Sequence, residues 1–185
     1  MEKGGSLLSR FVYEQFGSKN GLLRYFCHSV LAKAGVYRRF YNIPPTHFER
    51  LVFICSGNIC RSPLAEAYAR SLGKRAASCG LNCGDGFPAD PRARDFARLK
   101  GLTLEEHKTV NVSDFQFQDS DLVVVMEPSH LGLLRKKVAG DYRVVLAGGY
   151  CARPIPYIHD PYNCNEQFFI KCETKVMEAV RGLCA

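Results

Sequence analysis

A short apolar run that leads into a cysteine, a tight loop and a helix constrains this chain more than any other feature. Residues 51–54 are continuously apolar, which indicates a strand buried on both faces, although periodicity alone also allows a helix. Cys55 follows the run, and from Pro63 onward apolar residues recur at helical spacing. The sequence therefore predicts a strand, a loop and a helix, with free backbone N–H groups gathered where the helix starts.

Such a loop is suited to bind an anion. The N–H groups and the helix dipole favour negative charge, so they can hold a phosphate and stabilise a thiolate. Cys55 is therefore the candidate nucleophile. Arg61 offers a planar fork of donors that matches two phosphate oxygens. The Cys-x5-Arg spacing alone is weak evidence, and a buried cysteine beside a surface arginine is the structural alternative.

The complete string Cys-x-Gly-Asn-x-Cys-Arg-Ser-Pro is more specific, and it resembles the phosphate loop of the low-molecular-weight protein tyrosine phosphatase family. The match comprises Cys55, Gly57, Asn58, Cys60, Arg61, Ser62 and Pro63. The resemblance implies a substrate-binding loop made of Ser56, Gly57, Asn58, Ile59, Cys60 and Ser62. It further implies that Asn58 braces the loop in a left-handed conformation and that Ser62 hydrogen-bonds the Cys55 thiolate.

Cys60 has two interpretations. In the family the equivalent cysteine can trap an oxidised nucleophile as a disulfide, which would make Cys60 the resolving thiol of a reversible redox switch for Cys55. The alternative is a buried loop residue with no such role.

Two Asp-Pro pairs compete for the role of general acid, because expelling a tyrosine phenolate needs a proton donor. Asp90 and Asp160 could each cap a helix, which is the commoner role of such an aspartate. The resemblance favours Asp160, since residues 160–162 match the family's late Asp-Pro-Tyr loop and Asp90 matches a structural helix start. It implies that Tyr162 stacks on the substrate ring. Asn163 replaces a second tyrosine common in the family and leaves substrate preference open.

The rest of the chain predicts an α/β domain. Further strands are expected at 75–78, 122–126 and 142–146. Helices are expected after Asp90, ending before Gly101, and after Ser129 as a cap. The alternation indicates a parallel sheet. The resemblance implies a four-stranded parallel sheet with helices on both faces, a flavodoxin-like architecture, with the chemistry at the carboxyl ends of the strands.

Residues 1–48 precede the resemblance, so we expect a helical extension there and a catalytic domain at 49–185. Apolar residues share a helical face within 7–16 and again within 22–34, with Gly17 to Gly21 between them and Pro44-Pro45 as a stop. The extension holds seven Lys and Arg against two Glu. A packed layer on the catalytic domain is the first interpretation. Interfacial helices on an anionic membrane, a protein-partner surface and a targeting peptide are alternatives.

Composition narrows the class of protein. The 185 residues suit one catalytic domain with an extension. Nine cysteines, an odd number scattered along the chain, argue against a secreted disulfide framework and for a reducing, cytoplasmic location, with peripheral membrane attachment left open. Cys79-x3-Cys83 makes zinc a minor alternative. No run has the length of a membrane span, and nucleic-acid binding has only the basic pI to support it.

The expected activity is hydrolysis of phosphotyrosine in proteins, with no metal and no cofactor. Cys55 attacks phosphorus while Asp160 protonates the leaving oxygen, and water activated by Asp160 then hydrolyses the phosphocysteine. Arg61 and the loop N–H groups stabilise the phosphoryl charge. A non-catalytic phosphate-binding adaptor is one alternative, and an arsenate reductase of the same fold is another. The latter should carry a cysteine where this chain has Met126 and Glu127, and phosphoarginine phosphatases usually have threonine at the place of Ile59.

Overall fold

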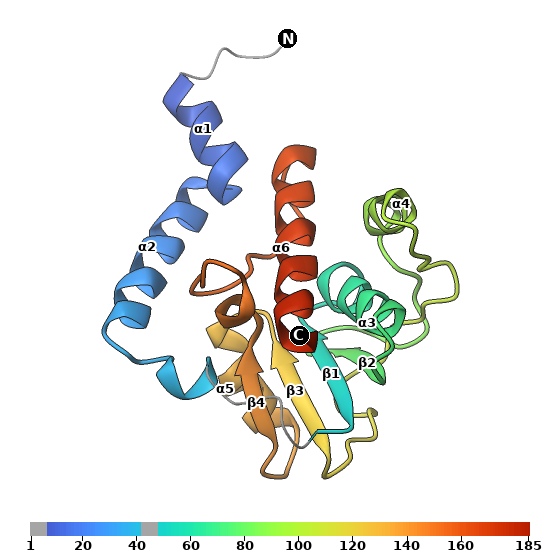
Figure 1. The fold of residues 1–185 in the computed structure, drawn as a ribbon. Coiled ribbons are helices and arrows are strands. Elements are labelled where there is room, and N and C mark those ends of the chain that lie inside the picture. Colours follow the sequence, from blue (N-terminus) through green and yellow to red (C-terminus); the bar gives the residue numbers. More distant parts are fainter. Residues whose placement is uncertain (1–6, 42–47) are drawn as a thin grey trace.

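The computed structural model describes residues 7–41 and 48–185. Within them, four parallel strands form one sheet, as predicted, and the strand order is β2-β1-β3-β4 (Figure 1). The strands are β1 Arg50–Cys55, β2 Ala76–Gly80, β3 Asp121–Val125 and β4 Arg143–Leu146. Because the chain leaves β1 for one side of the sheet and later returns to the other, the carboxyl end of β1 is a topological switch point, where parallel sheets bind ligands.

Helices cover both faces of the sheet. The helices α3 Arg61–Ser71, α4 Pro91–Leu99 and α6 Glu166–Cys184 lie over one face, and α5 Pro128–Lys137 lies over the other. Alternate residues of β1 supply the two cores: Leu51 and Phe53 point into the first, and Val52 and Ile54 into the second. All four side chains are fully buried, which explains the continuous apolar run.

The extension forms two helices, α1 Leu7–Phe16 and α2 Lys19–Lys33, followed by the short helix η1 Arg38–Phe40. Gly17 has φ +73° and ends α1, and the Ser18 hydroxyl caps α2 by accepting from the Gly21 N–H at 2.9 Å. The sequence predicted that this helix would start after Gly21. Because of the Ser18 cap, α2 begins at Lys19. The expected Pro44-Pro45 stop lies outside the described residues.

The extension is attached to both sides of the domain. Tyr37 and Phe40 are buried in the second core, beside Val52 and Ile54. Helix α1 runs next to α6 (Figure 1), where the Lys171 ammonium donates to the Gln15 carbonyl at 3.1 Å. The extension therefore packs on the domain as a layer. In the described part of the chain, no helix is long and apolar enough to cross a membrane.

Helix α2 turns the apolar face that the sequence pattern indicated toward solvent. The apolar side chains that share a face in the sequence, among them Leu23, Phe26 and Val30, are exposed. The opposite face, with Tyr25 and His28, packs against Tyr157 of the α/β domain, at ring distances of 6.2 and 5.2 Å.

Two helix starts also differ from the prediction. Helix α5 begins with Pro128 after the cap residue Glu127, so Ser129 lies inside the helix; proline is favoured in a first turn because its missing N–H is not needed there. Helix α3 begins at Arg61, two residues before Pro63. Helix α4 starts and ends where predicted, with Asp90 as its cap.

Candidate active site

Cys55 lies buried at the carboxyl end of β1, where the loop turns into α3. Its Sγ atom is 3.0 Å from the Ser62 hydroxyl and accepts the Asn58 backbone N–H at 3.2 Å. Ser62 belongs to the first turn of α3, so the sulfur faces the N-terminus of this helix. The N–H groups and dipole at that end favour a negatively charged sulfur or ligand.

Asn58 fixes the shape of the loop, as expected. Its φ of +52° is left-handed. The side-chain amide donates to the Ser62 and Ser78 hydroxyls, both at 2.9 Å, and its oxygen accepts the Val110 N–H at 2.9 Å. The Asn58 carbonyl lies 2.7 Å from Nε2 of His107. All polar atoms of the side chain are thus used, and the loop is held in its ligand-binding shape in advance.

The remaining loop residues are tied to their surroundings through the backbone. Ser56 and Ile59 are partly buried, and their carbonyls accept the N–H groups of Asn82 at 2.8 Å and Asp90 at 2.9 Å. Gly57, between them, is also partly buried. All three therefore remain partly accessible to solvent.

Gly80 lets β2 approach the loop closely. A Cβ atom at this position would lie 2.9 Å from Cβ of Asn58 and 2.5 Å from Sγ of Cys83. Since such distances are too short for carbon and sulfur, a side chain at residue 80 would displace Asn58, Cys83 or both.

Arg61 is buried and reaches three acceptors. One terminal nitrogen, Nη1, donates to a carboxylate oxygen of Glu127 at 2.8 Å and to the Ile158 carbonyl at 3.1 Å. The other, Nη2, forms an ion pair with Asp160 at 2.9 Å. The arginine of the loop and the candidate acid therefore meet at the same place.

Glu127 was missed as a site residue. It is buried, and its second oxygen accepts from Nη2 of Arg24 in helix α2 at 2.7 Å. Burial opposes its charge, but the charge and hydrogen bond of Arg61, together with the other nearby positive groups including Arg24, hold the pKa of Glu127 below its usual value. One signal was available: Glu127 comes soon after a buried strand, at the edge of the sheet where Cys55 was expected.

His130, one helical turn after Glu127, is buried as well. Burial and the positive charge of Arg61 lower the pKa of His130 to about 4, so the ring is neutral near pH 7. Because His130 is neutral, the Glu127 carboxylate is balanced by its ion pairs with Arg61 and Arg24.

Arg92 holds in place the loop that carries the candidate acid, residues 160–162, which we call the acid loop. Its guanidinium donates to the Tyr162 carbonyl at 2.6 Å, and its backbone N–H donates to the Asp90 carboxylate at 2.8 Å. Asp90 thus serves as the helix cap that the sequence predicted. The Tyr162 N–H donates to Asp160 at 3.2 Å, and the Tyr162 side chain is half-exposed beside the acid.

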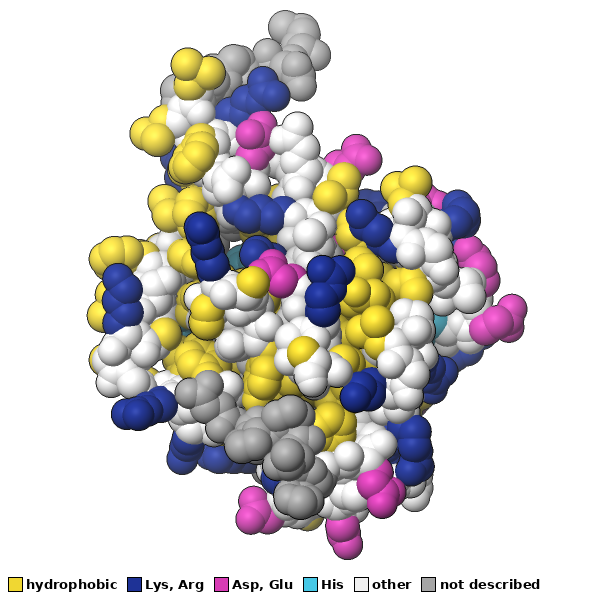
Figure 2. Space-filling model, viewed as in Figure 1, with side chains coloured by type: hydrophobic (Ala, Val, Ile, Leu, Met, Phe, Trp, Pro, Cys, Tyr) yellow, Lys and Arg dark blue, Asp and Glu magenta, His cyan; other side chains and the backbone are white. Residues whose placement is uncertain are grey.

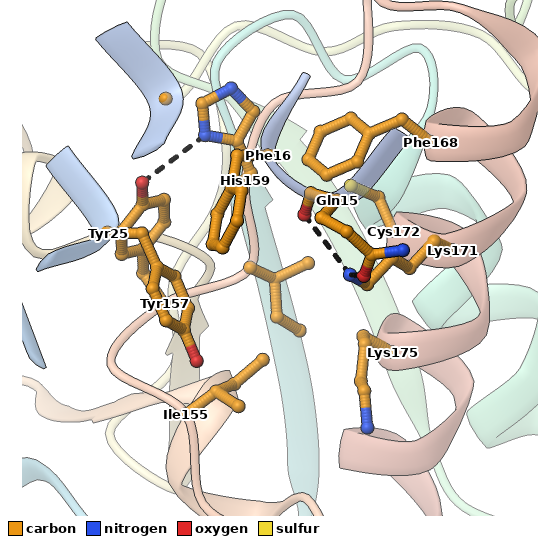
Figure 3. A pocket seen from close by; sticks show the side chains of 12 residues that line it. Gln15, Phe16, Tyr25, Ile155, Tyr157, His159, Phe168, Lys171, Cys172 and Lys175 are labelled. Carbon is orange, nitrogen blue, oxygen red and sulfur yellow. Dashed lines mark hydrogen bonds between the residues drawn. The ribbon is translucent and has the colours of Figure 1, made fainter. Parts of the chain in front are cut away.

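His159 contacts aromatic neighbours. Its Nδ1 lies 3.3 Å from the Tyr157 hydroxyl, and its ring meets Phe168 edge-on (Figure 3). Burial lowers the pKa of His159. Behind it lies a pocket of about 230 Å³ between the extension, the acid loop and α6. Its lining, mainly apolar, comprises Gln15, Phe16, Gly21, Tyr25, Ile155, Tyr157, Ile158, His159, Phe168, Lys171, Cys172 and Lys175.

Cys60 is buried next to the site. Burial and the nearby charges of Glu173 and Asp90 raise the pKa of its thiol, so it carries its proton at neutral pH. All nine cysteines are free thiols. In the described part of the chain, no group of three or more His, Cys, Asp or Glu side chains is arranged to hold a metal ion.

Glu173 of α6 is a further buried carboxyl group. Both of its oxygens lack a hydrogen-bond partner among the described residues. Burial raises the pKa of Glu173 to about 8, with the nearby Arg61 charge acting in the opposite direction.

Comparison with known proteins agrees with this geometry. The family model described as low molecular weight phosphotyrosine protein phosphatase matches residues 50–185. The Salmonella typhi low molecular weight protein-tyrosine-phosphatase Wzb is 32% identical over 139 residues, which are 72% of this chain and 91% of Wzb.

Two solved structures are similar in fold. The Erwinia amylovora tyrosine phosphatase AmsI superimposes with a TM-score of 0.65 at 25% identity, covering 77% of this chain and 95% of AmsI. Vibrio vulnificus Wzb in complex with benzylphosphonate superimposes with a TM-score of 0.64 at 27% identity, covering 74% of this chain and 97% of Wzb.

Proposed function

This chain belongs to the low molecular weight phosphotyrosine protein phosphatase family, and from that membership we propose that it hydrolyses phosphotyrosine through a phosphocysteine on Cys55. It is a cysteine-dependent protein-tyrosine-phosphatase, and its substrates are phosphoproteins. The observation that carries the mechanism is the contact of 2.9 Å between Arg61 and Asp160, because it brings the candidate acid to the loop that holds Cys55.

The first step transfers the phosphoryl group to sulfur. The substrate phosphate displaces the Asp160 carboxylate from Arg61 and takes the loop N–H groups as further donors. Released from Arg61, Asp160 takes up a proton from solvent. The Cys55 thiolate then attacks phosphorus, the bond to the tyrosine oxygen breaks, and Asp160 gives its proton to that oxygen. Ser62 and the Asn58 N–H, which contact the sulfur, orient the nucleophile.

The second step restores the enzyme. Asp160, now a carboxylate, accepts a proton from water as the water attacks the phosphocysteine, and Cys55 leaves as a thiolate. Arg61 stays bound to the phosphoryl oxygens in both steps. Tyr162 beside the acid offers a face on which a phosphotyrosine ring can stack, and the benzylphosphonate bound by Vibrio vulnificus Wzb is a compound of that shape.

The test is metal-free hydrolysis of phosphotyrosine, phosphoserine and phosphoarginine peptides by the parent protein and its variants. We expect turnover of phosphotyrosine only. Cys55→Ser should abolish it, and Asp160→Ala should slow it by about 10²- to 10⁴-fold, the usual contribution of a general acid. Asp90→Asn is the matched control, since asparagine also caps helices and activity should persist.

Three results would contradict the proposal. Full activity of Asp160→Ala toward phosphotyrosine would remove Asp160 from the mechanism. Turnover of phosphoarginine in its place would change the substrate class. Phosphate binding without hydrolysis of any peptide would favour the adaptor alternative.

We also propose that Cys60 is the resolving thiol of a peroxide-sensitive switch. Peroxide oxidises Cys55 to a sulfenic acid, which condenses with the Cys60 thiol to a disulfide and water. The raised pKa of Cys60 predicts slow closure, because the thiolate is the attacking form. Parent enzyme treated with peroxide should regain activity in dithiothreitol, whereas Cys60→Ser should become irreversibly inactive. Equal recovery of activity by the parent enzyme and Cys60→Ser would contradict the proposed switch.

For the chain as a whole, we propose that residues 49–185 are the catalytic domain and residues 1–48 an extension with its own binding function. The docked helices α1 and α2 and the buried Tyr37 and Phe40 support a permanent layer. The binding function of the extension would reside on the surface that faces away from the catalytic domain.

A further inference from the structure

Helix α2 packs on the catalytic domain with its less apolar face and leaves its apolar face exposed. Its inner face carries Gly21, Tyr25 and His28, whose contacts are mostly polar or aromatic. The outer face carries large aliphatic and aromatic residues in solvent. A helix that served only to cover the domain would bury its apolar side, because that burial supplies most of its stability.

The exposed side chains line up on one face. Leu22, Phe26 and Val30 follow each other at spacings of four, and Leu23 lies beside them. Phe26 is 64% and Leu23 62% exposed. Helix α1 continues the apolar surface with exposed Leu7, Leu8 and Phe11, and Leu7 is 89% exposed. We call these seven residues the outer stripe. Single exposed apolar residues are common, but a group of this size marks an interaction surface.

Basic residues lie within and around the outer stripe. Lys19 and Lys33, at the two ends of α2, fall on the same helical face as Phe26. Neither has an ion pair among the described residues. Residues 7–41 contain six Lys and Arg and one acidic residue, Glu14, which pairs with Arg10. Figure 2 shows hydrophobic and basic side chains gathered over α1 and α2 along the edge of the molecule.

We propose that the outer stripe docks on an anionic lipid bilayer. Leu, Phe and Val side chains would enter the boundary between headgroups and acyl chains, while the lysines reach out to lipid phosphates. The charge argues against a second copy of this chain as the occupant. Two copies of the stripe would bring Lys19 and Lys33 toward each other's basic surface, where the one carboxylate within residues 7–41, Glu14, already pairs with Arg10. A bilayer also accommodates a stripe spread over two helices without a shaped groove.

The absence of tryptophan from the chain permits a clean test. Phe26→Trp places one fluorophore in the stripe of the full-length protein. Leu99→Trp is the matched control, on α4 and 83% exposed. Both proteins are titrated with phosphatidylcholine vesicles that contain or lack phosphatidylglycerol. We expect the emission of Phe26→Trp to shift to the blue and to be quenched by brominated lipid with the anionic vesicles only, and that of Leu99→Trp to stay unchanged.

Charge variants test the role of the lysines. In the Phe26→Trp background, Lys19→Gln with Lys33→Gln should weaken partitioning about fivefold for each lysine removed. Lys74→Gln with Lys136→Gln removes the same charge from exposed positions elsewhere and should have a much smaller effect. Hydrolysis of p-nitrophenyl phosphate by each variant reports that it is folded, because none of these residues lies in the active site.

The proposal is independent of the catalytic mechanism and can fail in three ways. No response of Phe26→Trp to anionic vesicles, in a protein that is active, would overturn it. If both double lysine variants lost the same share of vesicle binding, the attraction would be due to overall charge and not to docking by the stripe. A blue shift that grows with protein concentration without lipid, together with a doubled mass by light scattering, would assign the stripe to a second copy.

Discussion

Glu127 is one carboxylate shared by two arginines from distant parts of the chain. Arg61 comes from the phosphate loop and Arg24 from the extension, with contacts of 2.8 and 2.7 Å. Arg24 therefore takes part of the negative charge that would otherwise act on Arg61 alone. Since Arg61 must also bind the substrate phosphate, the extension influences the site through this one residue.

Replacing Arg24 by glutamine should therefore weaken phosphate binding. The remaining Glu127 charge would hold Arg61 more tightly, so the KM for phosphotyrosine peptide and the inhibition constant of vanadate should rise about two- to fivefold, as expected for a half-exposed ion pair. Arg24→Lys should restore part of the affinity. Lys19→Gln removes the same charge from α2 without this contact; an equal effect from it would refute the role of the contact.

Glu173 should make the stability of the protein depend on pH. Its pKa is about 8 in the folded protein and 4.5 in its ordinary state, so the folded protein keeps a proton that the unfolded chain releases. Stability should fall as pH rises from about 5 to about 8, by at most about 1.4 kcal/mol per pH unit from this group. Glu173→Gln should remove this slope in urea unfolding, whereas Glu178→Gln should keep it. A slope unchanged by Glu173→Gln would show that this carboxyl is charged when folded.

At the scale of elements, Gly80 at the end of β2 allows this strand to approach the phosphate loop closely. Gly80→Ala introduces a Cβ that collides with Asn58 and Cys83. We expect a loss of roughly 1 to 3 kcal/mol in stability and a lower kcat, since Asn58 shapes the loop. Gly132→Ala in α5 is the control, because nothing lies within 4 Å of its added Cβ. Thermal unfolding and kcat would measure both effects, and parent-like values for Gly80→Ala would show that the loop can move away freely.

Elements with a local signal were predicted well. The apolar run at 51–54 marked strand β1, and Asp90 with Pro91 marked the start of α4. The orientation of α2 was not predictable in this way, because periodicity shows that a helix has an apolar face but not which face meets the protein. The Tyr25 and His28 contacts to Tyr157 arise only once the chain has folded.

The same distinction applies to the site. Cys55, Asn58, Arg61 and Ser62 lie close together in the sequence, so one motif indicates them all. Ser78, His107 and Glu127 reach the loop from three other segments. Their residue types are common, and only tertiary contacts distinguish them from other polar residues.

At the scale of the whole molecule, the extension is part of the folded core. Tyr37 and Phe40 are buried against the face of the sheet that α5 only partly covers. A chain shortened to residues 49–185 would expose this apolar surface.

We therefore expect the shortened chain to unfold at a lower temperature than the full chain and to bind the dye ANS more strongly. Phe40→Ala in the full-length protein should reproduce part of the loss, at most the roughly 3 to 5 kcal/mol of a buried phenylalanine. Phe11→Ala, in the exposed part of α1, should have little effect on stability. A shortened chain as stable as the full one would contradict a structural role for the extension.

The pocket behind the acid loop bears on how inhibitors could distinguish this phosphatase from its relatives. Gln15, Phe16, Gly21 and Tyr25 form one side of it, and all four lie outside the part of the chain that the family model matches. Salmonella typhi Wzb aligns with this chain over 91% of its own length, within a match that leaves more than a quarter of this chain uncovered. A compound filling this pocket would contact side chains outside the part of the chain that the family model matches, whereas one bound at the phosphate loop would meet a motif typical of the family. Selectivity is therefore more readily obtained in this pocket than at the phosphate loop.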